Sequence, residues 1–141
     1  MDADYTAAKG YLRGERYYGR IVRKFFLFGG IVMLVSLPFF GDFVPGNPMI
    51  SLVALVGISL AAGFLNPVMR SAVVFDVLVS IVAMVIFEYE ALSLYSTAAG
   101  FRGQLFLAVN QILALNFFLA TYYGAKSVRG LFIKAKIVNS D

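Results

Sequence analysis

The chain has 141 residues, of which 60% are hydrophobic and 14% are charged, and its formal net charge is +4. Soluble domains are usually about half apolar and about a quarter charged, so this balance indicates a single membrane-embedded domain. Cysteine and histidine are absent, which excludes disulfides, thiolate or imidazole metal sites and the usual proton switch near neutral pH.

Residues 1–24 form a basic, tyrosine-rich segment ahead of the apolar part of the chain. Tyr11, Tyr18, Val22 and Phe25 recur at helical spacing, which is typical of an amphipathic helix lying on the inner membrane surface. The alternative is a flank that only fixes the orientation of the first span. Because a juxtamembrane position already explains the basic charge, we expect no nucleic-acid partner.

Residues 25–124 contain four apolar runs, each near the ~20 residues that cross a hydrocarbon layer as a helix. They predict an all-α, polytopic membrane protein in which four transmembrane helices form an antiparallel bundle. A soluble core is disfavoured, because the rest of the chain is too short to cover four helices that are apolar on all sides. The expected spans are residues 25–44, 49–66, 71–95 and 104–124.

Short connections separate these runs. The Pro-Gly-Asn-Pro sequence at residues 45–48 predicts a tight turn after the first span, and Asn66–Pro67 predicts the end of the second span. Pro38 lies inside the first run, where it should kink the helix or mark its end. The third connection is expected at residues 96–103.

Basic residues indicate the orientation in the membrane. Ten of the twelve lie outside the four-span region, six before the first span and four after the last. The positive-inside rule then places both termini in the cytoplasm of a plasma (inner) membrane, with Arg70 inside and Arg102 outside. Residues 125–141 are expected to form a short basic cytoplasmic tail along the membrane surface, and within it residues 132–138 fit either a helix or an alternating strand.

The second span contains a small-xxx-small pair, Gly57 and Ala61. Small residues let helix backbones approach closely in lipid. Such a pair either receives a second copy of the chain or a neighbouring helix of the same bundle. With three sister helices available, the intramolecular contact is the simpler expectation.

The third span contains acidic residues. A carboxylate at the membrane centre costs about 2.5 kcal/mol or more, so it usually faces a partner or a water cavity. Asp76, about five residues inside the span, is interpreted either as a proton- or cation-binding carboxylate or as a boundary residue. In the second case it pairs with Arg70 or with a neighbouring hydroxyl or amide. Glu88 and Glu90 are expected at the outer interface.

The fourth span is polar in several directions. Its amides should bridge helices, so Asn110 and Gln111 are expected to make inter-helix contacts, with a polar lining for a substrate path as the alternative. Other polar residues of this span lie at the depth where an antiparallel third span presents an acid and a serine. The candidate ion, proton or polar-network site consists of Asp76, Ser80, Asn116 and Thr121.

An enzyme is not expected, because nucleophile–base pairs usually need His, Cys or Lys, and no lysine lies inside the spans. The acids within the spans point in different directions, so neither a metal nor a cofactor is expected. The favoured interpretation is a non-catalytic membrane subunit or assembly protein that works as a homo-oligomer or in a larger complex. The alternative is a small oligomeric transporter or channel that uses Asp76.

The run Arg-Lys-Phe-Phe-Leu-Phe-Gly-Gly at residues 23–30 and the four-span layout resemble GtrA-type proteins, which are implicated in moving polyprenyl-linked sugars. Residues 63–66 and 116–118 match in part the Asn/Phe-rich, basic ends of that family's even-numbered spans. The resemblance implies translocation of a lipid-linked sugar as one form of the transport alternative, and it assigns no functional residue.

Overall fold

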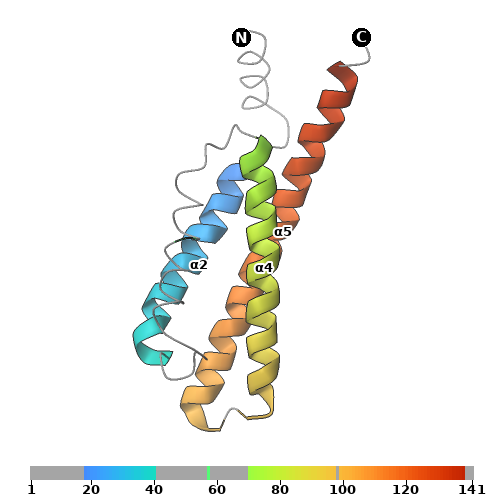
Figure 1. The fold of residues 1–141 in the computed structure, drawn as a ribbon. Helices are drawn as coiled ribbons and strands as arrows, with labels where there is room; N and C mark the ends of the chain where they lie inside the picture. Colours follow the sequence, from blue (N-terminus) through green and yellow to red (C-terminus); the bar gives the residue numbers. More distant parts are fainter. Residues whose placement is uncertain (1–17, 41–56, 58–69, 98, 139–141) are drawn as a thin grey trace.

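The structure, a computed structural model, describes residues 18–40, 57, 70–97 and 99–138. These residues form three long helices, α2 (Gly19–Phe40), α4 (Arg70–Tyr95) and α5 (Gly100–Val138) (Figure 1). Each is long and apolar enough to cross a membrane. The described part of the chain is therefore helical, as predicted, and consistent with a membrane protein. The expected second span, residues 49–66, lies outside the described residues except for Gly57.

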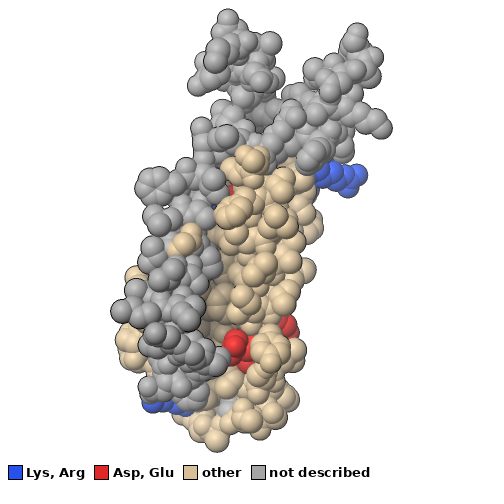
Figure 2. All heavy atoms as spheres, viewed as in Figure 1, with Lys and Arg blue, Asp and Glu red and all other residues tan. Residues whose placement is uncertain are grey.

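Hydrocarbon explains why these sequences become helices. α4 is rich in valine and isoleucine, which in water favour strands. A segment surrounded by lipid must satisfy its own backbone hydrogen bonds, and a helix does so without a neighbour. The outward faces of all three helices accordingly expose large apolar side chains. On the face seen in Figure 2, few atoms of Lys, Arg, Asp or Glu interrupt the surface of the described residues.

α5 is the central helix, and α2 and α4 both run antiparallel to it (Figure 1). Contacts in each pair join residues in opposite chain order: Phe25 with Tyr123 and Phe40 with Phe106, then Ser80 with Thr121 and Glu88 with Gln111. α2 and α4 therefore run in the same direction. We call the end of the bundle where α2 and α4 begin the upper end, and the end where α5 begins the lower end.

Two helix boundaries near the upper end differ from the predicted spans. α2 begins at Gly19, so residues 19–24 of the basic segment are continuous with the first span rather than a separate interfacial helix. α5 runs for 39 residues, about 58 Å, and its last turns project beyond the other helices (Figure 1). The strand alternative for residues 132–138 is wrong, because these residues continue α5.

Near the lower end, Pro38, predicted to kink the first span or to mark its end, lies inside α2 two residues before its last described residue. The connection predicted at residues 96–103 is shorter in the structure, because α5 already begins at Gly100. Gly100 has a φ of 78°, a left-handed conformation that glycine adopts without the steric cost of a side chain. α4 matches its predicted span to within one residue.

The core lies where all three helices meet. The Phe117 ring of α5 is fully buried, lies edge-on to Phe26 of α2 at 5.6 Å and stacks on Phe87 of α4 at 5.7 Å between ring centroids. Small residues let the helices close around these rings: a Cβ added at Gly29 would lie 2.9 Å from the Phe117 ring. Close packing of this kind is what holds helices together in lipid.

Two glycines of α5 provide a matched test of this packing. A Cβ added at Gly124 would lie 2.6 Å from Cγ2 of Val77 in α4, whereas one added at Gly130 meets no atom within 4 Å. We expect Gly124→Ala to lower the free energy of unfolding by about 1–3 kcal/mol through overpacking. Gly130→Ala should raise it by about 0.5–1 kcal/mol, because alanine is the better helix former. Unfolding in mixed micelles followed by circular dichroism measures both, and equal effects would contradict the α4–α5 packing.

Candidate functional site

Ser80 and Thr121 join α4 to α5 within one turn of the midpoint of α4, on its upper side. The Thr121 hydroxyl oxygen lies 3.0 Å from the Ser80 hydroxyl oxygen and 2.8 Å from the carbonyl oxygen of Phe117. Ser80, which is fully buried, donates to the carbonyl oxygen of Val77 at 2.9 Å. Both hydroxyls are thus satisfied by each other and by their own helices. This arrangement stabilises the helix pair and leaves neither hydroxyl proton free to bind a ligand.

Asn116 bonds in another direction. Its side-chain amide donates to the carbonyl oxygen of Phe25 in α2 at 2.9 Å, so it joins α5 to α2 rather than to α4. Gly29 makes room for it, since a Cβ there would lie 3.0 Å from the Asn116 amide nitrogen. The predicted cluster of four is therefore divided: Ser80 and Thr121 meet, whereas Asn116 serves the opposite helix.

Asp76 lies in a cavity between all three helices near the upper end. The cavity measures about 10 Å³, which is close to the room that one water molecule needs. Gly19 and Gly124 contribute no side chain and so leave the space open, while Arg23 of α2 places its positive charge close enough to act on the carboxylate. The remaining lining residues are Val22, Val73 and Ser127.

The Asp76 carboxylate is only partly satisfied. Its Oδ1 atom is buried and has no hydrogen-bond partner among the described residues. A buried carboxylate oxygen normally accepts a hydrogen bond from protein or ordered water. The charged neighbour in the described part of the chain is Arg23 on another helix, whereas the side chain of Arg70, the partner predicted from the sequence, lies outside the described side chains.

The same end carries an aromatic and basic layer. Ser127 accepts a hydrogen bond from the backbone N–H of Tyr18 at 3.1 Å, and this ties α5 to the residue that precedes α2. The ammonium group of Lys126 lies 5.0 Å from the Tyr18 ring centroid and 5.8 Å from that of Tyr122. Cations over aromatic faces, beside the hydrocarbon layer, are typical of a membrane interface.

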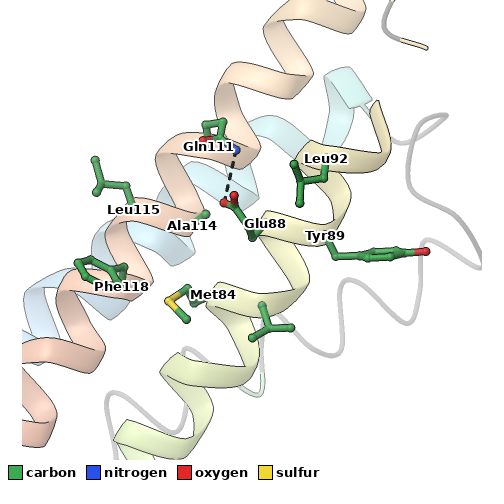
Figure 3. Close-up of a pocket in the computed structure, with 9 residues that line it drawn as sticks. Met84, Glu88, Tyr89, Leu92, Gln111, Ala114, Leu115 and Phe118 are labelled. Carbon is green, nitrogen blue, oxygen red and sulfur yellow. Dashed lines mark hydrogen bonds between the residues drawn. The ribbon is translucent and has the colours of Figure 1, made fainter. Parts of the chain in front are cut away.

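A second polar pair lies in the lower half of the bundle. Gln111 of α5 donates a long hydrogen bond of 3.4 Å to Glu88 of α4, and both side chains are exposed (Figure 3). Asn110 instead donates to the carbonyl oxygen of Phe106 at 2.9 Å, so its amide nitrogen bonds within α5 rather than to another helix. Glu90 is half-buried. Within the described part of the chain, Gln111 rather than Asn110 therefore connects α5 to α4.

Glu88, expected at the outer interface, stands seven residues before the end of α4. It lies about 8 Å along the axis from the midpoint of α4, and half of a hydrocarbon layer is about 15 Å thick. With α4 centred in the layer, Glu88 lies several ångströms inside it. By contrast, Arg102 belongs to the lower end, where its guanidinium donates to the carbonyl oxygen of Phe39 at 2.6 Å and closes the last turn of α2.

A groove runs beside the Glu88–Gln111 pair between α4 and α5 (Figure 3). Its volume is about 520 Å³, and apart from these two residues it is lined mainly by apolar side chains. The sequence contains a signal for it, because polar residues interrupt two apolar stripes at helical spacing. The stripes are Met84, Glu88 and Leu92 on α4, and Gln111, Ala114, Leu115 and Phe118 on α5.

The chain matches no protein-family model, and neither a curated protein nor a solved structure matches it. The resemblance to GtrA-type proteins therefore rests on the residues quoted above. Among the described residues, no group of three or more His, Cys, Asp or Glu side chains could hold a metal ion. Function has to be argued from the geometry of the polar groups themselves.

Two neighbouring asparagines of α5 test which polar contacts hold the helices together. Asn116→Leu removes the bond to α2 and should lower the free energy of unfolding by about 1 kcal/mol. Because the chain has no cysteine, Phe40→Cys with Phe106→Cys can report the α2–α5 contact by disulfide formation. We expect slower cross-linking in the Asn116→Leu background only. Asn110→Leu is the control, since its bond lies within α5, and an equal effect of both would contradict the assignment.

Proposed function

We propose that the chain forms a four-span antiparallel bundle in a plasma membrane, with both ends in the cytoplasm. α2 and α4 run in the same direction, so residues 41–69 have to connect the lower end of the bundle to the upper end. The apolar run at residues 49–66 is long enough for that crossing. Basic residues on the described helices support the orientation: Arg20, Arg23, Lys24, Lys126 and Arg129 lie toward the upper end.

Cysteine labelling tests this topology in intact cells. Asn47→Cys should react with a membrane-impermeant maleimide from outside, because residue 47 falls in the connection after the first span. Val68→Cys should react only after the membrane is opened, because residue 68 precedes α4 at the upper end. Labelling of both residues from the same side would contradict a crossing between them.

We further propose that the bundle is a non-catalytic membrane subunit or assembly protein. The observation that carries this proposal is the use of the buried polar side chains. Backbone carbonyl oxygens accept hydrogen bonds from Ser80, Asn116 and Ser127. Thr121 bonds to the Ser80 hydroxyl on the neighbouring helix. A substrate path needs polar groups along its length that are free to bind the substrate. These four side chains are instead hydrogen-bonded within the bundle.

Gly57 supports assembly with a second copy. It is exposed, and a Cβ added there meets no atom within 4 Å. The intramolecular contact expected for the Gly57/Ala61 pair therefore receives no support at Gly57, while Ala61 lies outside the described residues. A small residue with open space around it permits the close approach that drives association in membranes.

A second candidate function is a small oligomeric transporter or channel, with translocation of a lipid-linked sugar as one form of it. The observation that favours it is the Asp76 cavity, where a buried carboxylate oxygen has no partner among the described residues and Arg23 lies opposite. A proton, a cation or a water molecule would satisfy that oxygen.

One reconstitution experiment separates the two functions. For an assembly protein, Gly57→Leu should abolish energy transfer between labelled copies in vesicles, because the larger side chain blocks close approach. Val82→Leu, at an exposed position of α4, is the matched control and should leave the signal unchanged. For a transporter, the vesicles should show a pH- or ion-dependent flux that Asp76→Asn abolishes. Wild-type vesicles with that flux and no association would overturn the assembly proposal.

A further inference from the structure

The groove between α4 and α5 combines an acidic group with an apolar lining. Glu88 projects from α4 toward α5 and meets Gln111 (Figure 3). Met84 of α4 and Leu115 and Phe118 of α5 also line the groove. Ala114, with its small side chain, leaves space behind the Glu88 carboxylate. The groove opens on the side of the bundle, so a molecule dissolved in the bilayer can enter it laterally.

The Glu88 carboxylate lacks a strong partner within the described helices. Its hydrogen bond from Gln111 is long, at 3.4 Å, and comes from a neutral amide. Among the residues that the structure describes, no lysine or arginine lines the groove. The basic residues of the described helices lie near the ends of the bundle, so a second copy of these helices would bring no cation to the depth of Glu88 either.

An anionic group at this depth requires compensation by a positive charge or by hydrogen-bond donors. Charge complementarity therefore selects a cationic occupant, and the apolar lining selects one that is itself lipophilic. The volume of about 520 Å³ falls within the range of roughly 300–1,000 Å³ that is typical of small-molecule sites. The Phe118 ring adds an aromatic surface of the kind that attracts organic cations.

We propose that the α4–α5 groove binds a lipophilic organic cation, with Glu88 as its counter-ion and Gln111 as the residue that positions the carboxylate. The site lies in the opposite half of the bundle from the Asp76 cavity and involves neither Gly57 nor the buried hydroxyl pair. It therefore goes beyond the proposed assembly function and stands independently of it.

Two probe ions of the same shape and opposite charge test the proposal on the purified full-length protein in lipid nanodiscs. Tetraphenylphosphonium should bind at least tenfold more tightly than tetraphenylborate, as measured by equilibrium dialysis against empty nanodiscs. Glu88→Gln keeps the size of the side chain and removes its charge, so it should abolish this preference. Glu88→Asp keeps the charge and should retain the preference.

Glu90→Gln is the matched control, because it removes an acid two residues away that does not line the groove. It should leave the preference for the cation unchanged. Circular dichroism and the Phe40→Cys/Phe106→Cys cross-link confirm that each variant is folded. Equal binding of both ions to the wild type, or a preference that survives Glu88→Gln, would overturn the proposal. Loss of self-association in Glu88→Gln with no change in cation binding would assign the groove to a second copy instead.

Discussion

The packing of α5 against two helices at once, centred on Phe117, is the interaction on which the rest of the structure depends. The ring fills the space between Phe26 and Phe87, one on each neighbouring helix. In hydrocarbon, no release of water drives helices together, so filled contacts and inter-helix hydrogen bonds have to do it. Because the buried Phe117 ring contacts both neighbouring helices, it fixes the rotation and the axial position of each relative to α5. α2 and α4 are therefore positioned by their contacts with α5 rather than by contacts with each other.

This packing also decides which polar groups meet. Ser80 faces Thr121, and three residues nearer the upper end Val77 packs against Gly124, so Asp76 lies level with the next turn of α5 rather than with Thr121. The acid therefore falls into the space left by the glycines, opposite Arg23. The difference of one helical turn between Asp76 and Thr121 therefore separates the predicted cluster. Ser80 and Thr121 form a structural hydroxyl pair, and the Asp76 carboxylate lies apart from them.

The sequence predicts the three described helices, because their length and apolarity favour helices that could span a membrane, where the backbone has little other choice. α4 shows this most clearly, since its bounds agree to within one residue. The limits of α2 and α5 are less predictable, because helical residues continue past the apolar run into the basic flanks. Neither the Arg23–Asp76 proximity nor the direction of the Asn116 bond is predictable, since each depends on which helices are neighbours and at what register.

The two halves of the bundle use their polar residues differently, and this difference bears on function. Around Ser80, Asn116 and Thr121 the hydrogen bonds point inward and close on the bundle, so mutation there should disturb folding before it disturbs any activity. At Glu88 the carboxylate is exposed and faces a groove open to the bilayer. The described helices give the Glu88 carboxylate one long hydrogen bond, from Gln111, and the cation proposed for the groove would supply the remaining compensation. The proposed cation site therefore lies on the lateral face of α4 and α5 rather than in the interior of the bundle.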